Sequence, residues 1–117
     1  MENTVIIYHN PRCSKSKQAL ELIQEEGVTP EVIKYLDKPP TAKTLHELLG
    51  MLGMGARGLL RKSEPEYAEL NLANPELTDE QLIQAMIKHP RLIERPIVVS
   101  GNRAVIGRPP EKVLDLI

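Results

Sequence analysis

One residue of this sequence stands out as a candidate for chemistry, the single cysteine Cys13 in the stretch HNPRCSKS at residues 9–16. A thiol reacts as its thiolate, and nearby cations or the first turn of a helix stabilise that anion. Asn-Pro begins a turn just before Cys13, and apolar residues spaced three and four apart follow it, so we expect Cys13 at or just before a helix N-terminus. Arg12, Lys15 and Lys17 add positive charge. We therefore interpret Cys13 as a reactive thiol rather than a small buried side chain.

The residues that follow Cys13 decide what kind of thiol chemistry is available. Residues 13–16 read Cys-Ser-Lys-Ser, so Ser16 occupies the place of the second cysteine in a C-x-x-C redox motif. A lone cysteine forms no internal disulfide and does not hold zinc by itself. An oxidised Cys13 must therefore pass its sulfur to an external thiol. The cysteine usage is typical of a cytoplasmic protein.

Three arginines stand where the hydrophobic pattern breaks: Arg61 at a helix end, Arg95 before Pro96, and Arg108 in a Gly-Arg-Pro stretch. A guanidinium group grips a tetrahedral oxyanion with two parallel hydrogen bonds, whereas lysine offers a point charge. These positions are candidates for an oxyanion site, and the alternative for each is an ordinary solvated charge. We interpret Arg57, Arg91 and Arg103 as solvated surface charges.

The elements that must position these residues predict an α/β domain. Apolar, β-favouring runs at residues 4–8 and 31–36 flank a helix that begins at Ser14 and ends at Gly27, which is a βαβ unit with parallel strands. Residues 97–99 and 103–106 predict an antiparallel hairpin, and a short helix is expected over residues 111–117.

An open, four-stranded mixed sheet in this order, βαβ and then ββα, is the thioredoxin-like architecture. In that fold the first βα turn carries the chemistry, and the proline before the third strand is typically cis. We therefore expect a cis bond between Arg95 and Pro96, in a loop that faces the Cys13 turn.

The stretch between the two halves of the sheet, about residues 38–94, is predicted to be a helical insertion in a single domain of residues 1–117. A helix with Thr41 as N-cap should end at Gly53, and short helices are expected at residues 56–62 and 65–70. Thr78 and Gln81 form a capping box, which predicts another helix up to His89-Pro90.

Composition excludes several classes of function. The formal charge of −1 provides no electrostatic footprint for nucleic acid or an anionic membrane, and Trp and Phe, which stack on bases, are absent. No apolar run approaches the roughly 18 residues of a membrane span. The first ten residues do not read as a signal peptide, because Glu2 and Asn3 precede the apolar run. His46 and His89 are interpreted as structural or solvated, so we expect no metal site.

The chain resembles the glutaredoxin-linked arsenate reductase family nearly from end to end. The stretches that carry this resemblance are IYHNPRCSKS (7–16), LLRK (59–62), LTDEQLIQAMIKHPRLIERPIVV (77–99) and IGRPPEKVLDLI (106–117). IYHNPxC together with RPIVV is a highly specific combination. The resemblance implies that Cys13 attacks arsenate and that Arg61, Arg95 and Arg108 bind the anion. It also implies that His9 helps the thiolate and that Ser16 donates a hydrogen bond to the sulfur.

The mechanism implied by the resemblance is a two-electron reduction of arsenate to arsenite through a covalent cysteine–arsenate adduct. Glutathione is the implied co-substrate, glutaredoxin is the implied protein partner, and no bound cofactor is implied. Arg12, Ser14 and Lys15 stand at positions where family members vary.

Two other functions remain open from the sequence. One is a general glutathione-dependent thiol oxidoreductase with no arsenical role. The other is a thioredoxin-like regulator that binds RNA polymerase, although proteins of that group carry a C-x-x-C switch, and Ser16 replaces its second cysteine here.

Overall fold

The structure, a computed structural model, describes residues 4–117. Two compact units make up the chain: a sheet unit, formed by the residues up to Lys38 together with Arg95–Ile117, and a helical unit, Pro39–Glu94. Glu2 and Asn3, the residues that speak against a signal peptide, lie outside the described residues. Within residues 4–117, no helix is long and apolar enough to cross a membrane.

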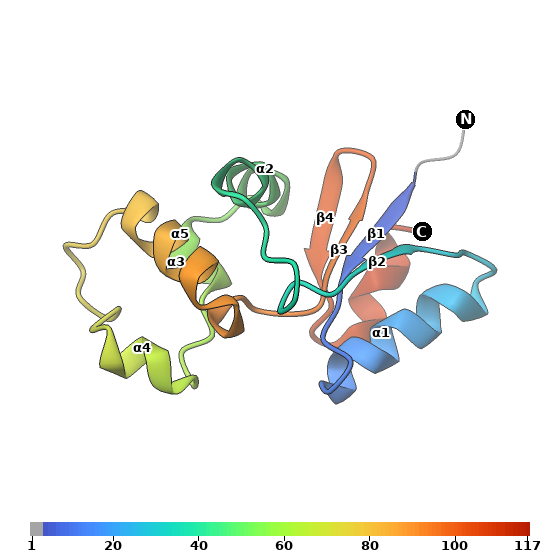
Figure 1. The fold of residues 1–117 in the computed structure, drawn as a ribbon. Coiled ribbons are helices and arrows are strands. Elements are labelled where there is room, and N and C mark those ends of the chain that lie inside the picture. The colour runs from blue at the N-terminus through green and yellow to red at the C-terminus, as the bar shows by residue number, and fades with distance from the viewer. Residues whose placement is uncertain (1–3) are drawn as a thin grey trace. The chain divides into compact units, whose positions relative to one another are not determined.

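The sheet unit contains the predicted four-stranded mixed sheet. Its strands are β1 (Val5–Tyr8), β2 (Glu31–Ile33), β3 (Ile97–Ser100) and β4 (Arg103–Ile106), in the spatial order β2-β1-β3-β4 (Figure 1). β1 pairs parallel with β2 and antiparallel with β3, and β3 pairs antiparallel with β4. This topology confirms the predicted βαβ unit, the hairpin and the thioredoxin-like fold.

One face of the sheet is covered by helix α1 (Ser14–Glu25) and the C-terminal 3₁₀ helix η2 (Pro110–Asp115). The residues packed between them are fully or almost fully buried and come from β1, α1, β3 and η2: Val5, Ile7, Ala19, Ile23, Val98 and Val113. The helix predicted at residues 111–117 is thus a 3₁₀ helix that begins one residue earlier. A proline at its first position suits a helix start, and so short a segment commonly takes the tighter form.

The second strand is shorter than the expected run of residues 31–36. β2 ends at Ile33, because the amides of Asp37 and Lys38 both donate to the carbonyl of Lys34 and turn the chain there. β2 lies at the sheet edge, where Val32 is 41% exposed, while Tyr35 in the following turn is buried. An apolar run alone therefore predicted a strand twice as long as the pairing supports.

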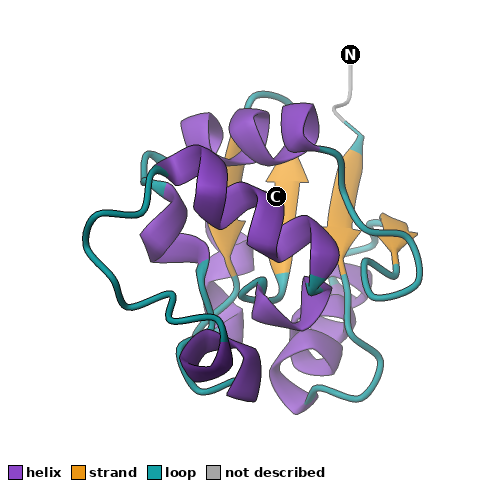
Figure 2. Cartoon of the chain, turned by 60° about the vertical axis from the view of Figure 1, so that its left-hand side comes forward, coloured by secondary structure: helices purple, strands orange, loops and turns teal. Residues whose placement is uncertain are grey.

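The regular elements of the helical unit are α2 (Ala42–Leu52), α3 (Ala56–Leu59), α4 (Pro65–Glu69), α5 (Asp79–Lys88) and the 3₁₀ helix η1 (Pro90–Leu92). Figure 2 draws the helices of the chain in purple and its strands in orange. The Thr41 side chain accepts the Thr44 amide as predicted for an N-cap, and Gly53 ends α2 with a φ of +68°. The predicted capping box at Thr78 and Gln81 is present at the start of α5.

Candidate active site

Cys13 is the N-cap of α1, as the sequence predicts. Its backbone is extended (φ −97°, ψ 122°), and its carbonyl accepts the Lys17 amide at 3.0 Å, the first bond of the helix. Its own amide donates to the Asn10 carbonyl at 3.0 Å. The side chain is half-buried, so the sulfur stands at the positive end of the helix dipole and remains accessible.

Asn10 organises the turn that leads to Cys13, a role not predicted from the sequence. Its side-chain oxygen accepts the Arg12 amide at 3.0 Å, and its own amide donates to the Ser16 hydroxyl oxygen at 3.0 Å. Asparagine often bonds the backbone two residues on, so the Asn-Pro pair that marks the turn could also have pointed to this contact.

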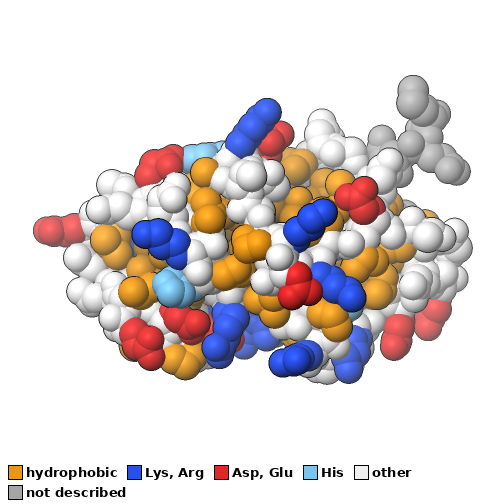
Figure 3. All heavy atoms as spheres, viewed as in Figure 1, with side chains coloured by type: hydrophobic (Ala, Val, Ile, Leu, Met, Phe, Trp, Pro, Cys, Tyr) orange, Lys and Arg blue, Asp and Glu red, His pale blue; other side chains and the backbone are white. Residues whose placement is uncertain are grey.

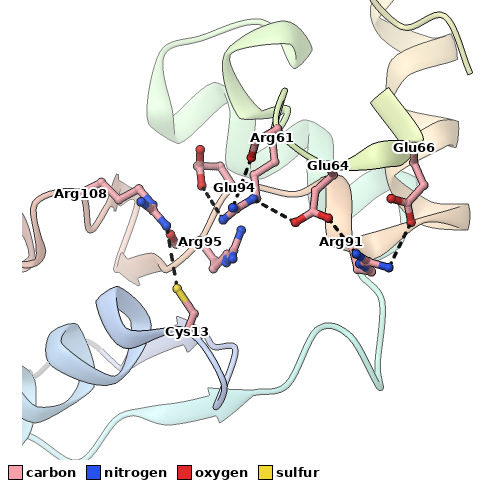
Figure 4. Close-up of polar contacts among 9 residues, drawn as sticks. Cys13, Arg61, Glu64, Glu66, Arg91, Glu94, Arg95 and Arg108 are labelled. Carbon is pink, nitrogen blue, oxygen red and sulfur yellow. Dashed lines mark hydrogen bonds and ion pairs between the residues drawn. The ribbon is translucent and has the colours of Figure 1, made fainter. Parts of the chain in front are cut away.

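Arg108 lies beside the cysteine. Its Nη2 atom is 3.8 Å from Sγ of Cys13, and its Nε donates to the carbonyl oxygen of Arg95 at 2.9 Å (Figure 4). The Arg95-Pro96 bond is cis, as predicted, and the Arg108-Pro109 bond is also cis, which was not predicted. Two of the three candidate arginines therefore belong to loops that meet at the thiol.

Gly107 lets these loops approach each other. Its amide donates to the Pro96 carbonyl at 2.9 Å, and a Cβ atom on Gly107 would stand 2.8 Å from Cγ of Pro96 and 3.2 Å from Cγ1 of Val113. A proline ring cannot swing away from such a contact. Pro96, the residue that would meet the added Cβ, is distant from Gly107 in the sequence, so no local pattern predicts this close approach.

His9 and Ser16 form a buried pair next to Cys13. Nδ1 of His9 lies 2.6 Å from Oγ of Ser16, and both side chains are almost or fully inaccessible to solvent. Burial lowers the pKa of His9, and the positive charges of Lys34 and Lys17 lower it further. The neutral imidazole is thereby favoured.

The hydrogen bond from Ser16 to the sulfur is not among the contacts of residues 4–117. The Ser16 hydroxyl is instead bonded to His9 and to the Asn10 amide. Ser16 thus links the imidazole to the turn that holds the cysteine.

Arg61 belongs to the helical unit. Its guanidinium lies 3.3 Å from Glu64 and 3.8 Å from Glu94, and Arg91 pairs with Glu64 and Glu66 (Figure 4). The amide of Arg61 donates to the Leu92 carbonyl at 2.7 Å. Glu64 is only three residues from Arg61, whereas Glu94 and Arg91 come from a distant segment, so the sequence patterns did not indicate the network as a whole.

The interpretation of Arg57 as a solvated charge is wrong. Its side chain is half-buried and donates to the carbonyl oxygens of Leu72 and Asn74. Arg91 is exposed but ion-paired, and Arg103 is exposed on β4.

Positive and negative side chains are interspersed on the face that Figure 3 shows.

His46 is exposed, as expected, and pairs with Glu80. Across residues 4–117, no group of three or more His, Cys, Asp or Glu side chains could hold a metal ion.

Comparisons with known proteins agree on one family. The model of the ArsC family matches residues 8–116. An arsenate reductase of Neisseria meningitidis (serogroup A) is 47% identical to this chain, and the alignment covers 92% of each of the two chains. The Escherichia coli protein YfgD, whose name states no activity, is 56% identical, and the alignment covers 100% of this chain and 99% of YfgD. The solved structure of an arsenate reductase from Vibrio cholerae matches over the whole of both chains, with a TM-score of 0.96 and 47% identity.

Proposed function

Because the chain belongs to the ArsC family, we propose that it reduces arsenate to arsenite with Cys13 as the nucleophile. The observation that carries this proposal is the position of the thiol at the N-terminus of α1, with the Arg108 guanidinium 3.8 Å from the sulfur. Relatives named arsenate reductase at 44–47% identity support it. A nucleophile beside a fixed cation suits an anionic substrate.

In the proposed reaction, the Cys13 thiolate attacks arsenic and forms an S–As bond, while one arsenate oxygen is protonated and leaves as water. A glutathione thiolate then attacks the Cys13 sulfur. The S–As bond breaks, its electron pair stays on arsenic, and arsenite leaves. Two thiols thus supply the two electrons. A glutaredoxin thiol takes the glutathionyl group from the mixed disulfide and restores Cys13.

The roles of the other residues follow from their contacts. Arg108, held by its bond to the Arg95 carbonyl, is aimed at the oxygens of an arsenate bound at Cys13. Arg95 and Arg61 are assigned to the same oxyanion because of the family resemblance, together with His9 and Ser16 as helpers of the thiolate. The reaction needs external thiols, which suits a cytoplasmic protein with one cysteine and no bound cofactor.

The test is arsenite production by the purified protein with arsenate and glutathione, in the presence and absence of glutaredoxin. We expect arsenite in the complete mixture and none with Cys13→Ser, while circular dichroism of the variant stays normal. Serine is a favoured N-cap residue, so the helix should be preserved. Activity in a folded Cys13→Ser protein would exclude the covalent mechanism. Reduction of glutathionylated peptides without arsenite production would favour the general thiol oxidoreductase.

A further inference from the structure

A pocket of about 360 Å³ opens in the sheet unit next to the turn that carries Cys13. Its walls come from the end of β1 and from the turn after β2, and the residues that matter below are His9, Arg12, Lys34, Leu36 and Asp37. The volume falls at the lower end of the range that is usual for small-molecule sites. None of these residues other than His9 has a role in the proposed reaction.

The two walls are held in place by backbone hydrogen bonds. The His9 amide donates to the Ile33 carbonyl at 2.8 Å and ties the end of β1 to the end of β2. The amide of Asp37 donates to the Lys34 carbonyl at 3.0 Å, so the side chains of Lys34 and Asp37 extend from one fixed turn. The backbone of both walls is therefore fixed.

The charged side chains of the pocket are two cations, Arg12 and Lys34, and one anion, Asp37. Leu36, which is 37% exposed, adds an apolar surface. Arg12 directly precedes Cys13, so the pocket adjoins the turn that carries the cysteine. A ligand with two carboxylates, one ammonium group and a short apolar stem would be complementary to these side chains.

Positive charges act on the histidine that lines the pocket. Besides burial, the charges of Lys34 and Lys17 lower the pKa of His9, which lines the pocket. Arg12, a further cation, and Asp37, an anion, also line the pocket. An anion bound beside Lys34 and Arg12 would offset these positive charges.

We propose that this pocket holds the acidic thiol co-substrate, with Arg12 and Lys34 binding its carboxylates and Asp37 binding its ammonium group. Glutathione has this chemistry, since it carries two carboxylates, one ammonium group and a thiol. The choice of a thiol as ligand rests on the function proposed above, whereas the charge pattern of the ligand comes from the pocket.

The test uses S-methylglutathione, which keeps the charges and cannot react. Titration of the full-length protein, followed by amide NMR, should shift the signals of His9, Arg12, Lys34 and Asp37 together. The bound carboxylates should also raise the pKa of His9, because they offset the positive field of Lys34 and Lys17. The matched control ligand is the dimethyl ester of S-methylglutathione, which lacks both negative charges and should bind more weakly.

Variants locate the site. Lys34→Gln removes one exposed ion pair and should weaken binding of S-methylglutathione about two- to five-fold, and Lys34→Glu should weaken it more. Lys112→Gln and Lys112→Glu, which change an exposed lysine of η2 in the same unit, are the controls and should bind as the wild type does. Equal affinities of the Lys34 and Lys112 variants would overturn the proposal, and so would signal shifts confined to the Arg108 loop.

The same experiments separate this inference from the proposed function. If S-methylglutathione binds at Lys34 but the protein reduces no arsenate, the site stands and the proposed reaction fails. If glutathione supports arsenate reduction while Lys34→Glu leaves both binding and the KM for glutathione unchanged, the reaction stands and this site is wrong. Shifts of His9 and Lys34 with sulfate but not with S-methylglutathione would assign the pocket to an inorganic oxyanion and also overturn the proposal.

Discussion

The guanidinium of Arg108 is shared between a backbone oxygen and the thiol: Nε donates to the Arg95 carbonyl at 2.9 Å, and Nη2 lies 3.8 Å from Sγ of Cys13. One side chain thus connects the loop after β4, the loop before β3 and the N-terminus of α1. Lysine cannot make both contacts, because its ammonium group is a point charge without a planar fork.

Arg108→Lys should therefore lose most of the rate of arsenate reduction while the positive charge remains. The loss of one donor to a developing anion typically costs roughly 10²–10³ in rate. Steady-state kinetics of the purified variant measures this. Arg103→Lys, an exposed position on β4, is the matched control and should keep the wild-type rate. A wild-type rate in Arg108→Lys would mean that the positive charge alone, and not the fork geometry beside Cys13, supports the reaction.

Gly107→Ala should destabilise the protein. The new methyl group would stand 2.8 Å from Pro96, whose ring cannot rotate away, and overpacking of this kind costs about 1–3 kcal/mol. Urea denaturation measures the change in the free energy of unfolding. Gly50→Ala in α2 is the control, because nothing lies within 4 Å of its added Cβ and alanine favours a helix. A neutral Gly107→Ala would show that the two loops can separate without cost.

The protein should become less stable as the pH falls below about 6.5, because protonation of His9 disfavours the folded state. Burial, and then Lys34 and Lys17, lower the pKa of His9 in the folded state, so between the lowered and the ordinary value the unfolded chain binds more protons. The stabilising contribution is complete above pH 6.5 and is lost as the pH falls through the folded-state pKa. The free energy of unfolding, measured between pH 7.5 and 5.5, should fall less steeply in His9→Gln. An unchanged slope would show that His9 does not contribute to this pH dependence.

Arg57→Ala should lower the free energy of unfolding by about 1.5–3 kcal/mol, because the carbonyls of Leu72 and Asn74 lose a charged donor in a half-buried place. Thermal and urea unfolding check this. Arg103→Ala, which removes an exposed arginine, should stay within about 0.5 kcal/mol of the wild type. If the two variants unfolded alike, the contacts of Arg57 would contribute no stability.

Features encoded by neighbouring residues were predictable from the sequence. The capping box of Thr78 and Gln81, the cap at Thr41 and the left-handed Gly53 each depend on residues within one or two turns of a helix. The placement of Cys13 at the start of α1 followed from the same local signals, and the cis bond at Pro96 came from fold analogy.

Features that depend on distant partners were not predictable. Arg57 carries no local mark of its bonds to an irregular segment 15 and 17 residues away, so it was taken for a surface charge. The crowding at Gly107 arises only when β4, η2 and the loop before β3 have assembled. The bond between His9 and Ser16 joins residues seven apart across a turn, and no periodic pattern predicts it.

The order of strands in the sheet has a consequence for the synthesis of the protein on the ribosome. β1 lies between β2 and β3, and the contact between Cys13 and Arg108 spans 95 positions of the chain. The ribosome delivers α1 and its thiol seconds before it delivers Arg108, at a synthesis rate of about 5–20 residues per second. During that interval β1 has only its β2 neighbour, and the sulfur lacks the guanidinium that will later lie beside it. The thiol is therefore made early, and its anion-binding surroundings are completed among the last steps of synthesis.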